Sequence, residues 1–82
     1  MQKVVPAADL LGEAIKLAEA IAAQAPLAVM ATRLNALKAV ELGPLEAMQE
    51  FVEVQKKLAA SEDFQEGVRS FVERRAAAFK GR

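Results

Sequence analysis

The sequence predicts an all-α fold built from four short helices. Apolar residues recur at spacings of three and four along most of the 82 residues, which is the pattern that one face of a helix produces. Residues that favour helix starts stand at the beginning of each periodic segment, and a Gly-Pro pair separates the second segment from the third. These observations predict a small helical bundle with helices at about 7–24, 26–42, 44–60 and 62–75.

The first predicted helix follows the extended segment Val4-Val5-Pro6. Pro6 disfavours helical geometry in the residue before it and fits the first turn of a helix. Two neighbouring apolar rows give this helix a wide apolar face that we expect to be buried. The rows are Leu10, Ala14, Leu17 and Ile21, and Leu11, Ile15, Ala18 and Ala22.

The second and third predicted helices meet at a sharp boundary. The second begins at Pro26, and Met30, Leu34 and Leu37 share one of its faces. Gly43 ends it, since glycine tolerates the left-handed backbone of a helix end, and the proline that follows fits the start of the next helix. The apolar residues of the third helix are Met48, Phe51, Val52, Val54 and Leu58.

The fourth predicted helix opens with Ser61, whose hydroxyl can accept a hydrogen bond from a backbone N–H of the first turn. Glu62 and Asp63 place negative charge at the positive end of the helix dipole. These features predict one amphipathic helix. Its apolar side consists of Phe64, Val68, Phe71 and Val72.

Only a thin core is expected, because alanine is abundant and the aromatic residues are 4 Phe. We predict that Leu34, Phe51, Phe64 and Val68 are among the more buried side chains. Replacing either of these two Phe by Ala should then cost about 3 to 5 kcal/mol if the ring is fully buried. The apolar faces exceed what four alanine-rich helices can bury. We therefore expect a dimer or higher oligomer whose interface uses the first or second helix.

The residue inventory argues against several kinds of site. The chain has no Cys and no His, so it lacks the usual ligands of zinc and the nucleophile and base pairs of Ser-His-Asp and Cys-His enzymes. We also expect its glutamates to be solvated, and we predict no catalytic residue and no metal site. The glutamates on polar helical faces are Glu46, Glu50, Glu53, Glu62, Glu66 and Glu73.

The charges total zero but are unevenly distributed along the chain. Residues 1–66 carry six basic and ten acidic residues, whereas residues 67–82 carry five basic and one acidic residue. The zero total gives no general attraction to nucleic acid, and Glu41 and Glu46 disfavour a DNA-binding helix-turn-helix around Gly43. No apolar run approaches the roughly 20 residues of a membrane span, and the polar faces are not basic. We expect no nucleic-acid or membrane partner and a cytoplasmic location.

The C-terminal sequence resembles that of a known family. Its acidic helix start is followed by Glu66-Gly67, Phe71, Glu73-Arg74-Arg75, Phe79 and Gly81-Arg82. This order closely resembles the C-terminus of enoyl-CoA hydratase/isomerase (crotonase) family enzymes. Val4-Val5-Pro6 and the apolar residues that follow it look like the lead-in and first helix of the same region, and Pro26-Leu27-Ala28-Val29 looks like its next helix. The resemblance therefore covers essentially all 82 residues.

The resemblance implies that residues 1–82 are a single helical C-terminal segment. In the family, an upstream core of repeated strand-strand-helix turns supplies the oxyanion hole and the acidic catalytic residues, and nothing in this chain resembles it. The helical segment supports trimer or hexamer assembly and helps to cover the acyl-CoA site. The parent would be an enoyl-CoA hydratase, a lyase of fatty acid metabolism, or an isomerase. The chain itself would require no cofactor and show no activity alone.

Two residues can be carried over from the family. Phe71 matches the tail aromatic that lies against CoA or its acyl chain, and Arg74 matches the basic residue near the adenosine phosphate. The resemblance therefore implies weak binding of a coenzyme A thioester by Phe71 and Arg74. The plainer alternatives are that Phe71 belongs to the core and that Arg74 is a solvated cation at a helix end. Residues 76–78 replace a segment that often contains Pro, which leaves the directions of Phe79 and Lys80 open.

The main rival is a stand-alone, non-enzymatic helical module that oligomerises through its Leu and Ala faces. The two hypotheses differ in what precedes Met1 in the reading frame. A strand-rich core there favours the enzyme segment, and a clean start favours the module.

Overall fold

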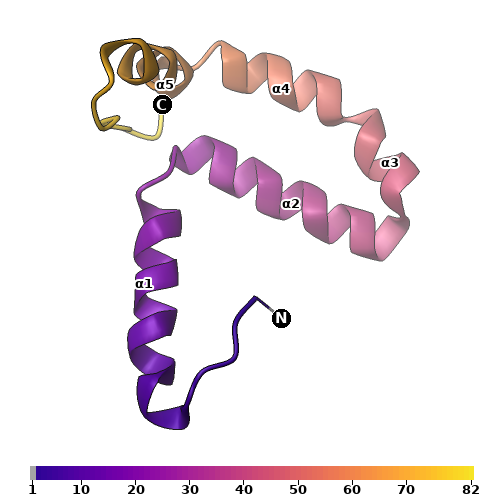
Figure 1. Cartoon of the computed structure of the whole chain (residues 1–82). Coiled ribbons are helices and arrows are strands. Elements are labelled where there is room, and N and C mark those ends of the chain that lie inside the picture. Colours follow the sequence, from indigo (N-terminus) through magenta and orange to yellow (C-terminus); the bar gives the residue numbers. More distant parts are fainter. Residues whose placement is uncertain (1) are drawn as a thin grey trace.

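The computed structural model describes residues 2–82, and every regular element in that range is helical (Figure 1). The all-α prediction is therefore confirmed. The elements are the 3₁₀ turn η1 (Ala7–Asp9) and the helices α1 (Leu10–Ala22), α2 (Pro26–Leu42), α3 (Pro44–Gln49), α4 (Phe51–Ala59) and α5 (Glu62–Glu73).

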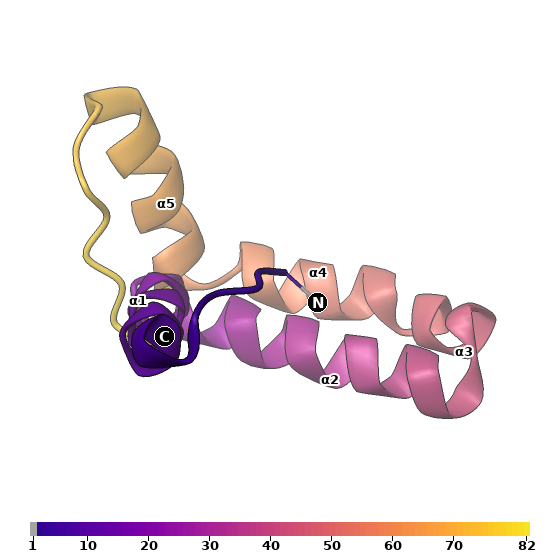
Figure 2. The ribbon, with the colours of Figure 1, turned by 60° about the horizontal axis from the view of Figure 1, so that its bottom comes forward.

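The helices form an open arrangement and not a closed bundle. Helices α2 and α4 run antiparallel and are joined by α3, while α1 leaves the start of α2 at a bend of 111° (Figures 1 and 2). Helix α5 follows α4, and the C-terminal residues return from it toward the beginning of α2 (Figure 2). The molecule measures 43 × 39 × 17 Å, so it is flat, and much of its surface faces solvent.

The helix expected at 44–60 is divided in two at Glu50, where the chain makes a turn between α3 and α4. Contacts with α2 accompany the turn: the Asn35 side chain donates a 2.8 Å hydrogen bond to the Ala47 carbonyl, and Lys38 pairs with Glu50 at 2.7 Å. Ala47 is only 3% exposed, because its small side chain lets α3 lie close to α2. The turn allows α4 to fold back along α2, which a straight helix would not do.

The other helix ends follow capping chemistry. Gly43 has φ 104° and ψ 161°, a conformation that is essentially restricted to glycine, and it ends α2. The Ser61 hydroxyl accepts the Phe64 N–H at 3.1 Å, as the sequence predicts. Helix α5 ends at Glu73 and not at residue 75, because Arg74 has left-handed geometry with φ 52° and ψ 44°. Helix α1 likewise ends at Ala22, two residues before the predicted end.

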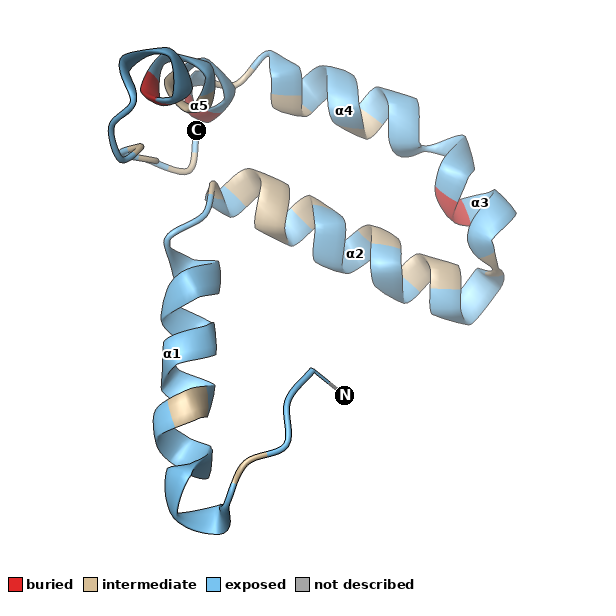
Figure 3. Ribbon diagram, viewed as in Figure 1, coloured by how far each residue is buried: buried red, intermediate tan, exposed pale blue. Residues whose placement is uncertain are grey.

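The predicted core residues are not buried within this chain. Leu34 is 60% exposed, Phe51 49%, and Phe64 and Val68 are each 52% exposed, so that prediction is wrong for the chain alone (Figure 3). Their replacement by Ala should cost well below the 3 to 5 kcal/mol of a fully buried ring, since most of the transfer term requires burial. Among the described residues, the buried ones are Ala47, Asp63 and Ser70.

The reason lies in which face of α2 turns inward. The partly buried residues of α2 are mostly small or polar, whereas Met30 and Leu34 are 62% and 60% exposed. Small side chains allow α3 and α4 to approach α2 closely, while the large side chains of Met30 and Leu34 remain exposed. The partly buried positions of α2 are Leu27, Ala28, Val29, Ala31, Asn35, Lys38 and Ala39.

None of the described helices is by itself long and apolar enough to cross a membrane. Residues Ala7–Ala22 and Pro26–Leu42 reach that length and composition only as a pair, and they are bent by 111° where they meet.

The special backbone at Gly43 gives a first prediction. A Cβ at this position would lie 3.0 Å from a carboxylate oxygen of Glu46, and the backbone conformation is itself unfavourable for other residues. Gly43→Ala should therefore lower stability by about 1–3 kcal/mol, measured as the thermal midpoint of the helical circular dichroism signal.

The matched control is Gly12→Ala, because Gly12 lies within α1 and a Cβ there has open space around it. That change should raise stability by about 0.5–1 kcal/mol, since alanine favours a helix interior. A Gly43→Ala chain that melts at or above the Gly12→Ala chain would contradict the role assigned to Gly43.

Candidate functional site

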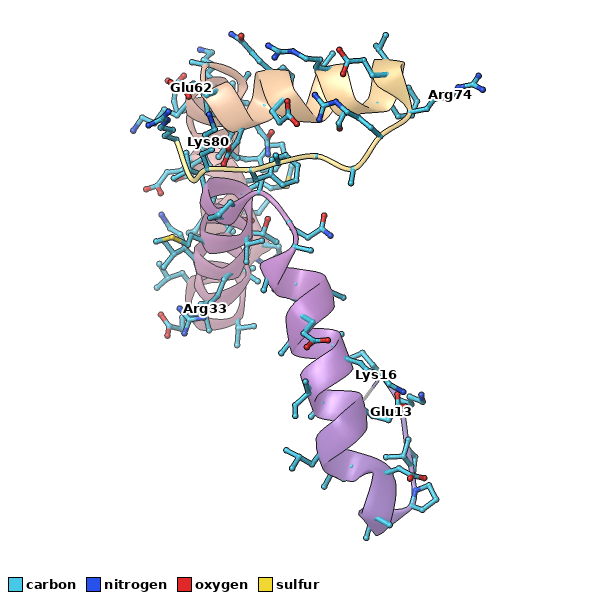
Figure 4. The ribbon with its side chains drawn as sticks, turned by 90° about the vertical axis from the view of Figure 1, so that its left-hand side faces the viewer. Glu13, Lys16, Arg33, Glu62, Arg74 and Lys80 are labelled. Atoms are coloured by element: carbon cyan, nitrogen blue, oxygen red, sulfur yellow. The ribbon has the colours of Figure 1, made fainter. Side chains whose placement is uncertain are left out.

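The C-terminal strap, defined as residues 75–82, is the feature around which the candidate site is built. It contains no regular helix and runs back along the full length of α5 (Figures 2 and 4). Lys80 consequently lies beside Glu62 at the beginning of the helix, while Arg74 stands at the opposite end (Figure 4). Side chains of the first two turns of α5 hold the strap in place.

Asp63 is the first anchor. Its carboxylate oxygens accept the backbone N–H groups of Lys80 and Gly81, each at 2.7 Å, and its own backbone N–H donates to the Arg82 carbonyl at 2.9 Å. The Asp63 residue is only 3% exposed, although the chain buries very little. These three hydrogen bonds fix the backbone of the strap. Two of them go to a charged carboxylate, and such bonds are stronger than those between neutral groups.

Glu66, one turn further along α5, is the second anchor. It pairs with the Arg75 guanidinium through two contacts of 2.5 and 3.0 Å and accepts the Ala78 N–H at 2.9 Å. The guanidinium, and after it the Ala78 N–H, lower the pKa of Glu66 from 4.5 to about 2. The same contact with Glu66, together with Glu73, raises the pKa of Arg75 further above its already high ordinary value.

The strap carries an aromatic ring to α5 and ends against α2. Phe79 lies over Gly67, where a Cβ would be 3.7 Å from the ring. A Cβ at Gly81 would lie 3.8 Å from the Pro26 ring, which places the end of the strap beside the first residue of α2. The directions that the sequence left open are thereby settled: the ring of Phe79 faces α5, and the backbone of Lys80 faces Asp63.

Two hollows adjoin the Phe79 ring of the strap. The first, called here the apolar cleft, has a volume of about 450 Å³ and lies between the start of α2, the end of α4 and α5. The second, called the outer hollow, has a volume of about 690 Å³ and lies at the C-terminal end of α5. Both are bounded by Gly67, Phe71 and Phe79. The further residues of the outer hollow are Ser70, Val72, Arg74 and Arg75.

The structure brings the two predicted site residues, Phe71 and Arg74, together in the outer hollow. Phe71 is 85% exposed, so the alternative that it is an ordinary core residue is wrong for this chain alone. Arg74 projects from the end of α5 (Figure 4) and forms no ion pair with any described residue. The hollow thus presents an aromatic face beside an unpaired cation, a combination that suits an anionic ligand with a flat ring.

Sequence reasoning missed the role of the anchors. Glu66 was expected to be solvated, but its side chain is 17% exposed and is engaged by Arg75, so that expectation is wrong. Asp63 was expected only to favour the helix dipole. The signal that could have indicated these anchors is the separation of charge, because the acidic start of α5 is followed by a basic tail that is long enough to fold back on it.

Candidate metal ligands are not gathered anywhere in residues 2–82, where no group of three or more acidic, His or Cys side chains has a suitable arrangement. Glu13 has two lysine partners instead: Lys3 and Lys16 lower its pKa by hydrogen bonding. Lys38 lowers the pKa of Glu50 in the same way.

The second prediction concerns the pH dependence of the strap. Folding lowers the pKa of Glu66 from 4.5 to about 2, so its contribution to stability is complete above pH 4.5 and is lost as the pH falls toward 2. The carboxyl ¹³C resonance of Glu66 and the amide resonance of Ala78 should therefore titrate together near pH 2.

Arg75→Gln should move that midpoint upward toward 4.5, because it removes the largest cause of the shift. Arg74→Gln is the matched control, since the neighbouring arginine does not contact Glu66, and it should leave the midpoint unchanged. A midpoint near 4.5 in the unaltered chain would show that the Glu66–Arg75 pair does not form in solution.

Comparison with known proteins gives consistent relatives. The family model described as enoyl-CoA hydratase/isomerase matches residues 1–82. The chain is 40% identical over 80 residues to the enoyl-CoA hydratase EchA19 of Mycobacterium tuberculosis. This match covers 96% of this chain and 30% of that protein.

Solved structures agree over the whole chain. A probable enoyl-CoA hydratase/isomerase from Mycobacterium abscessus is 41% identical with a TM-score of 0.92, and the match covers 100% of this chain and 32% of that one. An enoyl-CoA hydratase/isomerase from Mycobacterium paratuberculosis is 33% identical with a TM-score of 0.86, with the same coverage of 100% and 32%. The chain thus spans about a third of the length of these relatives. From its sequence and its fold, the chain belongs to the enoyl-CoA hydratase/isomerase (crotonase) family.

Proposed function

We propose that this chain is the assembly and acyl-CoA-covering segment of an enoyl-CoA hydratase or isomerase and is not catalytic by itself. Its partners would be further copies of the same protein and the catalytic core that the family places upstream. Its ligand would be a coenzyme A thioester, bound weakly through Phe71 and Arg74. The exposed aromatic ring beside an unpaired arginine in the outer hollow is the observation that carries this proposal.

The outward apolar faces support the role in assembly. Large apolar side chains are exposed along α1 and α2, among them Leu11 at 72%, Met30 at 62% and Leu34 at 60%. Monomeric soluble proteins rarely leave contiguous apolar faces of this kind in water, and such faces mark contacts with other protein surfaces. Helices α1 and α2 are therefore the preferred contact surfaces.

The backbone of Arg74 supports the role in ligand binding. Left-handed geometry at a helix end favours glycine, and a residue with a side chain pays roughly 1–2 kcal/mol for it. The arginine is thus present where glycine would be more stable. A contact between its guanidinium and a phosphate group of the ligand is a reason for keeping the arginine.

The arrangement of carboxylates supports the absence of catalysis in the chain alone. Hydration of an enoyl thioester needs a carboxylate placed to move a proton and backbone donors placed for the enolate oxygen. Asp63 and Glu66 are occupied by the strap, and Glu50 is paired with Lys38. The relatives that are called hydratases are about three times as long as this chain, which leaves room for those groups elsewhere.

The third prediction separates the effect of Arg74 on the stability of the chain from its effect on ligand binding. Arg74→Gly should leave the thermal midpoint unchanged or higher, because glycine accepts the left-handed backbone. The same change should weaken binding of coenzyme A about two- to fivefold, as expected for one exposed ion pair. Phe71→Leu should weaken it about two- to tenfold through loss of the aromatic face. Chemical-shift titration with coenzyme A at low and high salt measures the affinity of both variants.

Arg33→Gln and Phe51→Leu are the matched controls, because both residues lie on other helices and line neither hollow. They should leave the affinity unchanged. Crotonyl-CoA added to the unaltered chain should keep its conjugated thioester absorbance. Turnover that disappears when a single Glu is replaced would overturn the proposal, as would equal affinity in the Arg74→Gly and Arg33→Gln chains.

A further inference from the structure

We propose that Asp63 is a positioning residue for the outer hollow, acting through the strap to place Phe79 as the second aromatic wall of that site. The inference rests on the proposed function for its ligand, since the outer hollow contains Phe71 and Arg74. Asp63 itself does not line the outer hollow. It acts from the other end of α5, where Glu62 and Lys80 mark its position (Figure 4).

The link from Asp63 to Phe79 is short and rigid. Phe79 stands between Ala78, whose N–H is held by Glu66 at 2.9 Å, and Lys80, whose N–H is held by Asp63 at 2.7 Å. Both bonds hold the backbone on either side of Phe79, so its ring has little freedom to leave the helix. The Gly81 N–H adds a third bond to the same carboxylate at 2.7 Å.

Gly67 provides the space that the ring occupies. Its missing side chain lets the Phe79 ring lie on the helix surface, with ring carbons 3.7 and 4.0 Å from the position of a Cβ. Phe71, one turn further along α5, borders the same two hollows as Phe79. Phe71 and Phe79 thus form two aromatic walls of the hollows that Gly67 also lines, one supplied by the helix and one by the strap.

The chemistry of the anchor requires a carboxylate. Both Asp63 oxygens accept backbone N–H groups, and a carboxylate offers only acceptors. Asparagine has the same shape but replaces one oxygen by an NH₂ group, which would face an N–H of the strap. Two donors would then meet at a buried position, where an unmade hydrogen bond is costly. Asp63→Asn should therefore release the strap without altering the size of the side chain.

The test compares Asp63→Asn with Glu62→Gln in the whole 82-residue chain. Glu62 is the adjacent residue and also touches the strap, through an exposed 2.9 Å contact with Arg82, so it is a matched control. The nuclear Overhauser contact between the Phe79 ring and Gly67, and the slow exchange of the Lys80 and Gly81 amide protons, should be lost in Asp63→Asn. Both should persist in Glu62→Gln.

Coenzyme A titration supplies the second readout. Asp63→Asn should weaken its binding about two- to tenfold, the range of a single aromatic contact. Phe79→Ala should also weaken binding, but the Lys80 and Gly81 amide protons should stay protected, because their hydrogen bonds to Asp63 do not involve the ring. This second variant separates loss of the ring from general unfolding.

Retention of the Phe79–Gly67 contact in Asp63→Asn would overturn the proposal. So would an affinity for coenzyme A that is unchanged in Asp63→Asn and in Phe79→Ala but reduced in Phe71→Leu, because the strap would then not shape the site. If the unaltered chain binds no coenzyme A, the proposed ligand is wrong, and the positioning of Phe79 by Asp63 is decided by the contact and exchange measurements alone.

Discussion

The close approach of α3 and α4 to α2 is the constraint on which the arrangement of this chain depends. The approach is possible because most of the partly buried positions of α2 carry small or polar side chains, and because Ala47 of α3, which is buried, has a small side chain. A helix that turns small residues inward must turn its large apolar residues outward. Met30 and Leu34 are therefore exposed in the chain alone, and we propose that the apolar faces that a core would need are surfaces for contacts with other proteins.

The C-terminal end is stabilised mainly by hydrogen bonds and an ion pair, and only slightly by apolar burial. Helix α5 gains little from burial, since Phe64, Val68 and Phe71 are all at least half exposed. Its strap is held instead by hydrogen bonds from backbone N–H groups to the carboxylates of Asp63 and Glu66, and by the Arg75 guanidinium. The separation of acidic and basic residues along the sequence thus becomes an attraction between a helix and the tail that follows it. This attraction brings the Phe79 ring against Gly67 of α5, so that Phe79 lines the outer hollow together with Phe71 and Arg74.

The sequence predicted those features that depend on local chemistry. Pro26 and Pro44 at helix starts, Gly43 at a helix end and Ser61 as a cap all follow from the preferences of single residues. Periodicity could not tell which of two apolar faces of α2 turns inward, because alanine and leucine rows both look apolar. For that reason Leu34 was placed in the core, and the turn at Glu50, which depends on contacts with α2, was not foreseen. Phe71 and Arg74 could be chosen only from the family resemblance, while Asp63, Glu66 and Phe79 required the path of the strap.

Sedimentation equilibrium of the whole chain at micromolar concentration tests the central claim, that its outward apolar faces are contact surfaces, most directly. The account predicts reversible association to a dimer or larger species. Replacing the outer residues Met30, Leu34 and Leu37 together by Gln should weaken the association, whereas Gln at the exposed polar position Arg33 should not. A cooperatively folded monomer that shows no association at that concentration would contradict the account.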